Sequence, residues 1–179
     1  MDEIREPNSA EEILDIYDPQ HRRTRRRVRR GGALEGDDRL LVVHVCFINR
    51  KNEMLCQKRQ DSKKHYGGCW DLSAGGFALS GEDAAQAAQR ELQEEIGITV
   101  EPNGLRFLFT EPFSYVLDDY FFVRGEADPA TLTLEEEEVA EARWFSAADV
   151  EAMILDGRFV DYPLDGIRRV FRYAAEQSV

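Results

Sequence analysis

Cysteine, long apolar runs and positive charge are all scarce in this sequence of 179 residues. The three cysteines, Cys46, Cys56 and Cys69, are an odd number without a CxxC spacing, which argues against a disulfide framework and a cysteine zinc site. No apolar run approaches the roughly 20 residues that a membrane-spanning helix needs, and the first residues lack the apolar stretch of a signal peptide. We therefore expect a cytoplasmic protein that has no membrane-spanning segment.

Basic residues are outnumbered, because 23 lysines and arginines stand against 35 aspartates and glutamates, and the formal net charge is −12. General binding to nucleic acid depends on Lys and Arg neutralising phosphates, so this balance argues against it. The hydrophobic fraction of 42% excludes a disordered chain and suffices for the core of one domain. The surplus carboxylates either form solvating surface or are gathered to hold cations.

The arginines are unevenly distributed, because seven of them crowd into residues 22–30. We interpret this run as an extended edge segment paired with nearby acidic residues, and a patch that steers an anionic ligand is the alternative. The apolar residues of segment 11–17 predict a short strand just before the run. Residues 1–36 are accordingly expected to form an extension with an edge strand or hairpin, and residues 37–179 the main domain.

Strands and helices are mixed along the rest of the chain, which predicts an α/β fold with a mixed sheet. Residues 40–49 form a nearly continuous apolar run rich in β-branched side chains, typical of a central strand covered on both faces. His44 lies within this run, and we expect a buried, hydrogen-bonded histidine there. Residues 54–59 are predicted to return as its hairpin partner. Further strands are predicted at 105–110, 115–125 and 142–145, and helices at 80–96, 146–155 and 164–176.

The helix predicted at 80–96 has clear end signals and one apolar stripe. Ser80 is its expected N-cap, and Gly97 is expected to end it. Apolar residues at spacings of three and four predict one buried face. That face comprises Ala85, Ala88, Leu92 and Ile96.

Three carboxylates lie beside this buried stripe. At about 100° per residue, Glu91, Glu94 and Glu95 share an arc of the helix, and Arg90 can brace Glu94. Neighbouring carboxylates repel one another, and divalent cations among them offset that repulsion. Oxygen ligands without histidine or thiolate favour Mg²⁺ or Mn²⁺ over zinc. The glycine pair before the helix allows a tight turn that presents backbone groups to the same place.

The residues around these carboxylates follow the pattern G-x5-E-x7-R-E-U-x-E-E-x-G-U, in which U is apolar. Residues 76–98 thereby resemble the Nudix box at every defining position, and the likeness covers about residues 40–155. The resemblance implies the Nudix fold, an α/β/α sandwich with a mixed sheet. It also implies a hydrolase that cleaves a diphosphate linkage in a small organic molecule, by attack of a metal-activated water on phosphorus.

The resemblance further assigns roles by position. The implied metal ligands, for Mg²⁺ with Mn²⁺ as the alternative, are Glu91, Glu94, Glu95 and the carbonyl of Gly76. Arg90 would orient the glutamates, with Glu91 and Glu94 counted beside it as catalytic, and Glu82 would anchor the loop before the helix. The general base is left open between Glu91 and two later glutamates, Glu137 and Glu138, which are also possible extra ligands.

A second resemblance lies upstream of the box. The spacing of Arg59, Lys63, Lys64 and Trp70 is similar to that of isopentenyl-diphosphate isomerases, a group with the Nudix fold. The matching arginine and first lysine bind the substrate diphosphate in that group, so Arg59 and Lys63 are expected to contact phosphate. Surface cations at the end of a strand are the alternative.

The isomerase chemistry itself does not carry over. The active-site cysteine of the isomerases would stand at Gly75, and a metal-binding histidine at Phe77. Their other metal histidines would fall near Ala33 and Leu40. We therefore expect hydrolysis, and an isomerase-like enzyme or a non-catalytic diphosphate-binding module are the alternatives.

The substrate and the oligomeric state are left open by the sequence. A small-molecule diphosphate is the expected partner, and a homodimer is possible. Four aromatic residues outside the box either stack on a base, pack an isoprenoid tail or belong to the core, and the core is favoured for the last of them. These residues are Phe113, Tyr115, Tyr120 and Phe121.

Overall fold

The computed structural model describes residues 12–177 as an α/β fold. Its strands are β1 (Ile13–Tyr17), β2 (Arg23–Arg29), β3 (Leu40–Ile48), β4 (Met54–Arg59), β5 (Trp70–Asp71), β6 (Ala74–Phe77), β7 (Leu105–Phe113), β8 (Val116–Arg124) and β9 (Val139–Phe145). Its α-helices are α1 (Ala84–Ile96), α2 (Ala147–Leu155) and α3 (Leu164–Glu176), and short 3-10 turns lie at Pro102–Gly104 and Pro129–Thr131. Within these residues, every helix is too short or too polar to cross a lipid bilayer.

A seven-stranded mixed sheet forms the centre of the molecule. The strands run in the order β5-β4-β3-β8-β7, with β6 also beside β3 and β9 beside β4. Strands β3 and β8 are parallel, whereas the other pairs are antiparallel. The predicted hairpin of β3 and β4 opens at once, because the two strands share only the pair Ile48 and Met54. Each then takes another neighbour, so β3 pairs with β6, and the Gly75–Gly76 backbone lies beside the central strand.

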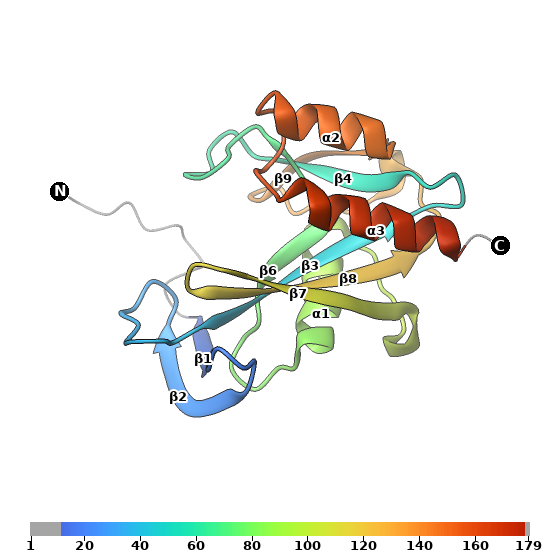
Figure 1. Cartoon of the computed structure of the whole chain (residues 1–179). Coiled ribbons are helices and arrows are strands. Elements are labelled where there is room, and N and C mark those ends of the chain that lie inside the picture. The colour runs from blue at the N-terminus through green and yellow to red at the C-terminus, as the bar shows by residue number, and fades with distance from the viewer. Residues whose placement is uncertain (1–11, 178–179) are drawn as a thin grey trace.

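Helices cover both faces of this sheet, as an α/β/α sandwich requires (Figure 1). The alternation along β3 explains the two layers, because successive side chains point to opposite faces. Val43 and Val45 pack with the buried side of α1, whereas Cys46 and Ile48 pack with α2 and α3. The almost fully buried β3 is therefore shared by the two cores.

A separate two-stranded sheet precedes the central one. Strands β1 and β2 pair antiparallel, and Leu14 and Ile16 pack against Leu40 at the start of β3. Glu11, with which the predicted first strand begins, lies outside the described residues. Within residues 12–177, five of the seven clustered arginines form ion pairs with acidic residues, in agreement with the interpretation as a paired edge segment. These pairs are Arg22–Asp18, Arg23–Asp15, Arg26–Asp38, Arg27–Asp15 and Arg30–Glu12.

Helix α1 begins four residues later than predicted. Asp83 is its N-cap, in a capping box with Gln86, so the prediction of Ser80 as the cap is wrong. The Ser80 hydroxyl instead donates to Asp15 of β1 at 2.8 Å. Ala88, Leu92 and Ile96 are buried as predicted, Ala85 is partly buried against the same core, and Ala87 is buried as well. Gly97 ends the helix in the left-handed conformation, as predicted.

Candidate functional site

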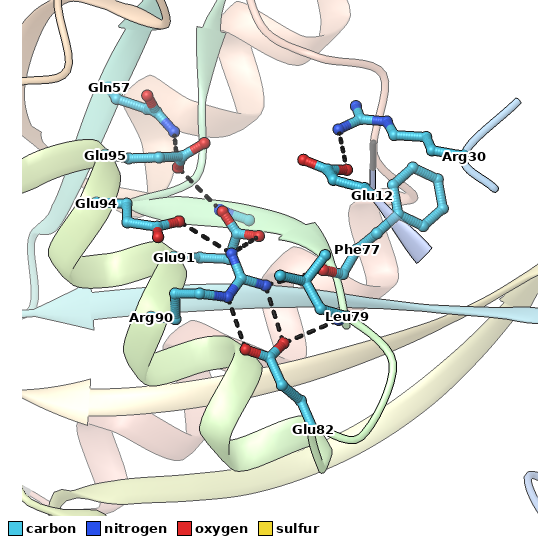
Figure 2. Close-up of polar contacts among 11 residues, drawn as sticks. Glu12, Arg30, Gln57, Phe77, Leu79, Glu82, Arg90, Glu91, Glu94 and Glu95 are labelled. Carbon is cyan, nitrogen blue, oxygen red and sulfur yellow. Dashed lines mark hydrogen bonds and ion pairs between the residues drawn. The ribbon is translucent and has the colours of Figure 1, made fainter. Parts of the chain in front are cut away.

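Arg90 is the centre of a hydrogen-bonded network on α1 (Figure 2). Its Nε and Nη2 atoms donate to the carboxylate of Glu82 at 2.8 and 3.0 Å, and Nη1 donates to Glu91 at 2.8 Å and Glu94 at 3.0 Å. Nη2 also donates to the carbonyl of Phe77 at 3.0 Å. All five donors of the guanidinium are therefore used, and a lysine with three donors cannot replace it.

Glu82 connects this network to the loop that precedes α1. Its carboxylate accepts from the backbone N–H of Leu79 at 2.8 Å in addition to the two bonds from Arg90. The helix is thus fixed to the end of β6, which brings Gly76 against the carboxylate of Glu91. A Cβ atom at Gly76 would lie 2.3 Å from Oε1 of Glu91. Only glycine leaves room for that carboxylate.

Two of the three clustered carboxylates are shielded from solvent. Glu95 is 7% exposed, and its carboxylate accepts from Gln57 at 2.7 Å and from the backbone N–H of Gly75 at 3.0 Å. Burial raises the pKa of Glu95 well above its usual value. Burial likewise raises the pKa of Glu91 to about 7, although the charge of Arg90 opposes that rise. A nearby cation would favour the ionised form of both groups. The third carboxylate, Glu94, is half exposed to solvent.

Arg59 is held by a chain of buried polar groups. Its Nη1 atom donates to Asp71 at 3.1 Å, and the other Asp71 oxygen accepts from the hydroxyl of Tyr162 at 2.7 Å. Tyr162 lies 3.4 Å from Nδ1 of His44, whose Nε2 is 3.0 Å from Asp118. His44 is therefore a hydrogen-bonded core histidine, as predicted. The chain restrains the guanidinium of Arg59 beside the clustered carboxylates of α1.

Lys63 and the late glutamates meet at the same place. Nζ of Lys63 donates to Glu138 at 2.5 Å, so two residues predicted for separate roles are in direct contact. The segment that carries Glu138 is attached to the site by its backbone, because the N–H of Glu135 donates to the carbonyl of Glu95 at 3.0 Å. Glu137 is exposed on this segment.

These residues line one pocket of about 230 Å³. The lining consists of Glu12, Arg30, Arg59, Lys63, His65, Gly75, Gly76, Arg90, Glu91, Glu94, Glu95, Glu135, Glu137 and Glu138. The lining includes every residue that the sequence indicated as a metal ligand, a phosphate contact or a general base. Glu82 lies outside the lining and holds Arg90 by two hydrogen bonds. Seven carboxylates stand against four Lys and Arg cations. Burial favours the protonated forms of Glu91 and Glu95, but five carboxylates still remain against the four cations. A pocket of this charge binds an anionic ligand poorly unless further cations enter with it.

The donor set fits a hard divalent cation. All the candidate side-chain ligands are carboxylates, and the missing side chain of Gly76 lets the Glu91 carboxylate approach its backbone closely. Within residues 12–177, no three His, Cys, Asp or Glu side chains already form a metal cage. The carboxylates are instead held by Arg90, Gln57 and the backbone of Gly75. Binding of a cation therefore requires side-chain movement, which the exposure of Glu94 permits.

Several residues in the pocket or in contact with its lining escaped sequence reasoning. Glu12 directly precedes β1 and Arg30 directly follows β2, and nothing local indicates that this part of the chain reaches the pocket. Gln57 is a polar residue in a buried strand position, and that mismatch is the one available signal. Of the four aromatic residues considered, Phe121 belongs to the core as favoured, Tyr120 is buried too, and Phe113 and Tyr115 are exposed.

Comparisons with known proteins agree with this geometry. The profile of the NUDIX domain family matches residues 38–164. A Nudix hydrolase of Listeria monocytogenes is 44% identical over 133 residues, which cover 74% of this chain and 79% of the relative. An isopentenyl-diphosphate Delta-isomerase of Halorhodospira halophila is 34% identical over 86 residues, 48% of this chain and 49% of that protein. A crystal structure of a Deinococcus radiodurans protein superposes with a TM-score of 0.75 at 21% identity, covering 89% of this chain and 99% of that one, which supports the fold. The chain belongs to the Nudix hydrolase family.

Proposed function

We propose that this enzyme hydrolyses the diphosphate linkage of a small organic molecule with the aid of Mg²⁺, or of Mn²⁺ as the alternative. The observation that carries the proposal is the excess of carboxylates over cations in one pocket that also contains Arg59 and Lys63. A diphosphate is itself anionic, so divalent cations must accompany it. Glu91, Glu94, Glu95 and the carbonyl of Gly76 are the groups we assign to hold them.

Each of the remaining residues has a definite task in this proposal. Arg90 holds Glu91 and Glu94 in place, and Glu82 holds Arg90. Arg59 and Lys63 donate to phosphate oxygens, for which Lys63 must leave Glu138.

A bound divalent cation would screen the phosphate oxygens and make the attacking water more acidic. As the water oxygen bonds to phosphorus and the bridging P–O bond breaks, Glu91, Glu137 or Glu138 accepts the proton of the water.

The isomerase alternative has less support from the residues. Leu40 and Phe77 stand near or at positions where the isomerases have metal-binding histidines. Both residues line one pocket of this protein, and both side chains are apolar. Gly75 supplies no thiol, and a Cβ atom there would lie 2.8 Å from the carbonyl of Val43. Hydrolysis therefore remains the better assignment, because all the groups it requires line the first pocket.

The test compares Glu94→Gln with Glu136→Gln under Mg²⁺. The panel contains dinucleotides, nucleoside diphosphate sugars, nucleoside triphosphates and isoprenoid diphosphates. Glu94 is half exposed, and an amide oxygen still accepts from Arg90, so the fold is retained. We expect turnover to fall about 100-fold or more in Glu94→Gln, and not in Glu136→Gln, an exposed glutamate that does not line the pocket.

Wild-type turnover in Glu94→Gln, or in excess chelator, would refute the proposal. Double-bond migration in isopentenyl diphosphate would identify an isomerase. Binding without turnover across the panel would identify a non-catalytic module.

A further inference from the structure

The N-terminal strands bring an ion pair to the rim of the catalytic pocket. Nη1 of Arg30 lies 2.9 Å from Oε2 of Glu12, and both residues line the pocket with Glu91. The guanidinium of Arg30 also lies over the ring of Phe77, 5.1 Å from its centroid. Figure 2 shows the pair beside Phe77, on the far side of the carboxylates from Gln57.

Arg30 also lines a second pocket of about 470 Å³ that the proposed chemistry does not use. Its other side-chain walls are Leu34, Leu40, Phe77 and Tyr115. Among the described residues, no carboxylate or carboxamide side chain lines it. The two pockets therefore differ sharply in chemistry, and Arg30 is the lining residue that they share.

The position of Arg30 is fixed by the attachment of β1 and β2 to the loop before α1. The carboxylate of Asp15 accepts from the Ser80 hydroxyl at 2.8 Å and from the Gly81 N–H at 2.9 Å. The N–H of Ser80 donates to the carbonyl of Ile13 at 2.7 Å. Arg30 is thus presented to the site by an anchored strand pair, and less conformational freedom is lost when a ligand binds.

We propose that Arg30 contacts the diphosphate of the substrate, and that the pocket of Phe77 and Tyr115 binds an uncharged aromatic group attached to that diphosphate. This rests on the proposed function. A phosphate can replace Glu12 as the partner of Arg30, because a guanidinium pairs with either anion in the same bidentate manner. The aromatic walls suit a planar ring. A sugar in place of the ring would find few partners for its many hydroxyl groups, because Arg30 and Tyr115 carry the polar side-chain atoms of this lining.

The experiment measures binding without turnover. Isothermal titration calorimetry at fixed Mg²⁺ compares two probes that resist hydrolysis, methylenediphosphonate and α,β-methylene adenosine diphosphate. The second probe carries an aromatic base and the first does not. We expect Arg30→Gln to weaken both probes about 10-fold, from the loss of one charge-assisted contact. Tyr115→Ala should weaken the adenosine probe about fivefold or more and leave methylenediphosphonate unchanged.

Two further variants sharpen the result. Arg25 is exposed on β2, the strand that directly precedes Arg30, and lines neither pocket, so Arg25→Gln should change neither affinity. Glu12→Gln removes the anion that competes for Arg30, and it should tighten both probes about threefold. Unchanged thermal midpoints show that each variant is folded.

The proposal is overturned if Arg30→Gln leaves both affinities within twofold of the wild type, or if Tyr115→Ala affects both probes equally. Failure of the hydrolase assignment is a separate result, because it appears in the turnover of Glu94→Gln and in the response to chelator.

Discussion

The close approach of Gly76 to Glu91 yields a prediction that separates activity from stability. In Gly76→Ala, the new Cβ would lie 2.3 Å from Oε1 of Glu91, whereas ordinary contact begins at 3.4 Å. The carboxylate must therefore move by about 1 Å, and a misplacement of that size near reacting groups can reduce turnover about 100-fold. The backbone of Gly76 is not in the left-handed region, so alanine itself fits the chain.

The accompanying loss of stability is expected to be small. The displaced atoms are the end of a flexible side chain, and Arg90 keeps its bonds to Glu82 and Glu94. The substitution weakens the charge-assisted hydrogen bond between Arg90 and Glu91. Alanine also lowers the entropy of the unfolded chain, which offsets part of that effect. The free energy of unfolding should therefore fall by about 1 kcal/mol. That corresponds to a fall in Tm of about 2–4 °C.

Steady-state kinetics and thermal unfolding of Gly76→Ala measure the two effects, with Gly104→Ala as the control. A Cβ at Gly104 meets no atom closer than 3.9 Å, so this variant should retain both activity and Tm. Full turnover of Gly76→Ala would refute the assigned position of Glu91. A Tm fall as large as that of a core truncation would show that the glycine serves the fold instead.

Three further predictions follow from other contacts. Arg90→Ala should reduce the free energy of unfolding by about 2 kcal/mol, because it leaves half-buried carboxylates without a donor. Urea titrations measure this loss, and an unchanged unfolding midpoint would contradict it. Tyr162→Phe removes the hydroxyl that restrains Asp71, and Asp71 in turn holds Arg59. In steady-state kinetics KM should therefore rise several-fold while kcat is unchanged, and a fall in kcat alone would contradict this role of Tyr162. Burial raises the pKa of Asp15, but hydrogen bonds and arginine charges outweigh it and the net pKa is lowered. Its stabilising contribution is therefore present above about pH 4 and lost as the pH falls through the lower folded-state pKa, so Asp15→Asn should flatten the acid limb of stability against pH.

Local patterns were sufficient for much of the fold and for the positions of the box residues. Glu91, Glu94 and Glu95 lie within five residues of one helix, so helical periodicity alone brings them together. The cap was mispredicted because Ser80 and Asp83 are both good N-cap residues, and only the contact of Ser80 with Asp15 decides between them.

Contacts between distant segments were beyond these patterns. Asp71 and Tyr162 are 91 positions apart in the chain, and no periodicity links them. The opening of the β3–β4 hairpin was missed for the same reason, because it depends on β6 and β9 competing as strand neighbours. Arg30 could be seen as part of a charged run, but not as the member that reaches the pocket.

The attachment of β1 and β2 divides the enzyme into parts that can vary independently. Asp15 and the backbone of Ile13 hold the strand pair to Ser80 and Gly81, and none of these residues lines the pocket of the clustered carboxylates. Under the proposed assignment, substitutions in residues 31–34, a segment that lines only the second pocket, can therefore alter ligand preference while the carboxylate cluster is inherited intact. A duplicated gene can acquire a new preference by drift in this short segment, and a protein engineer can use the same route.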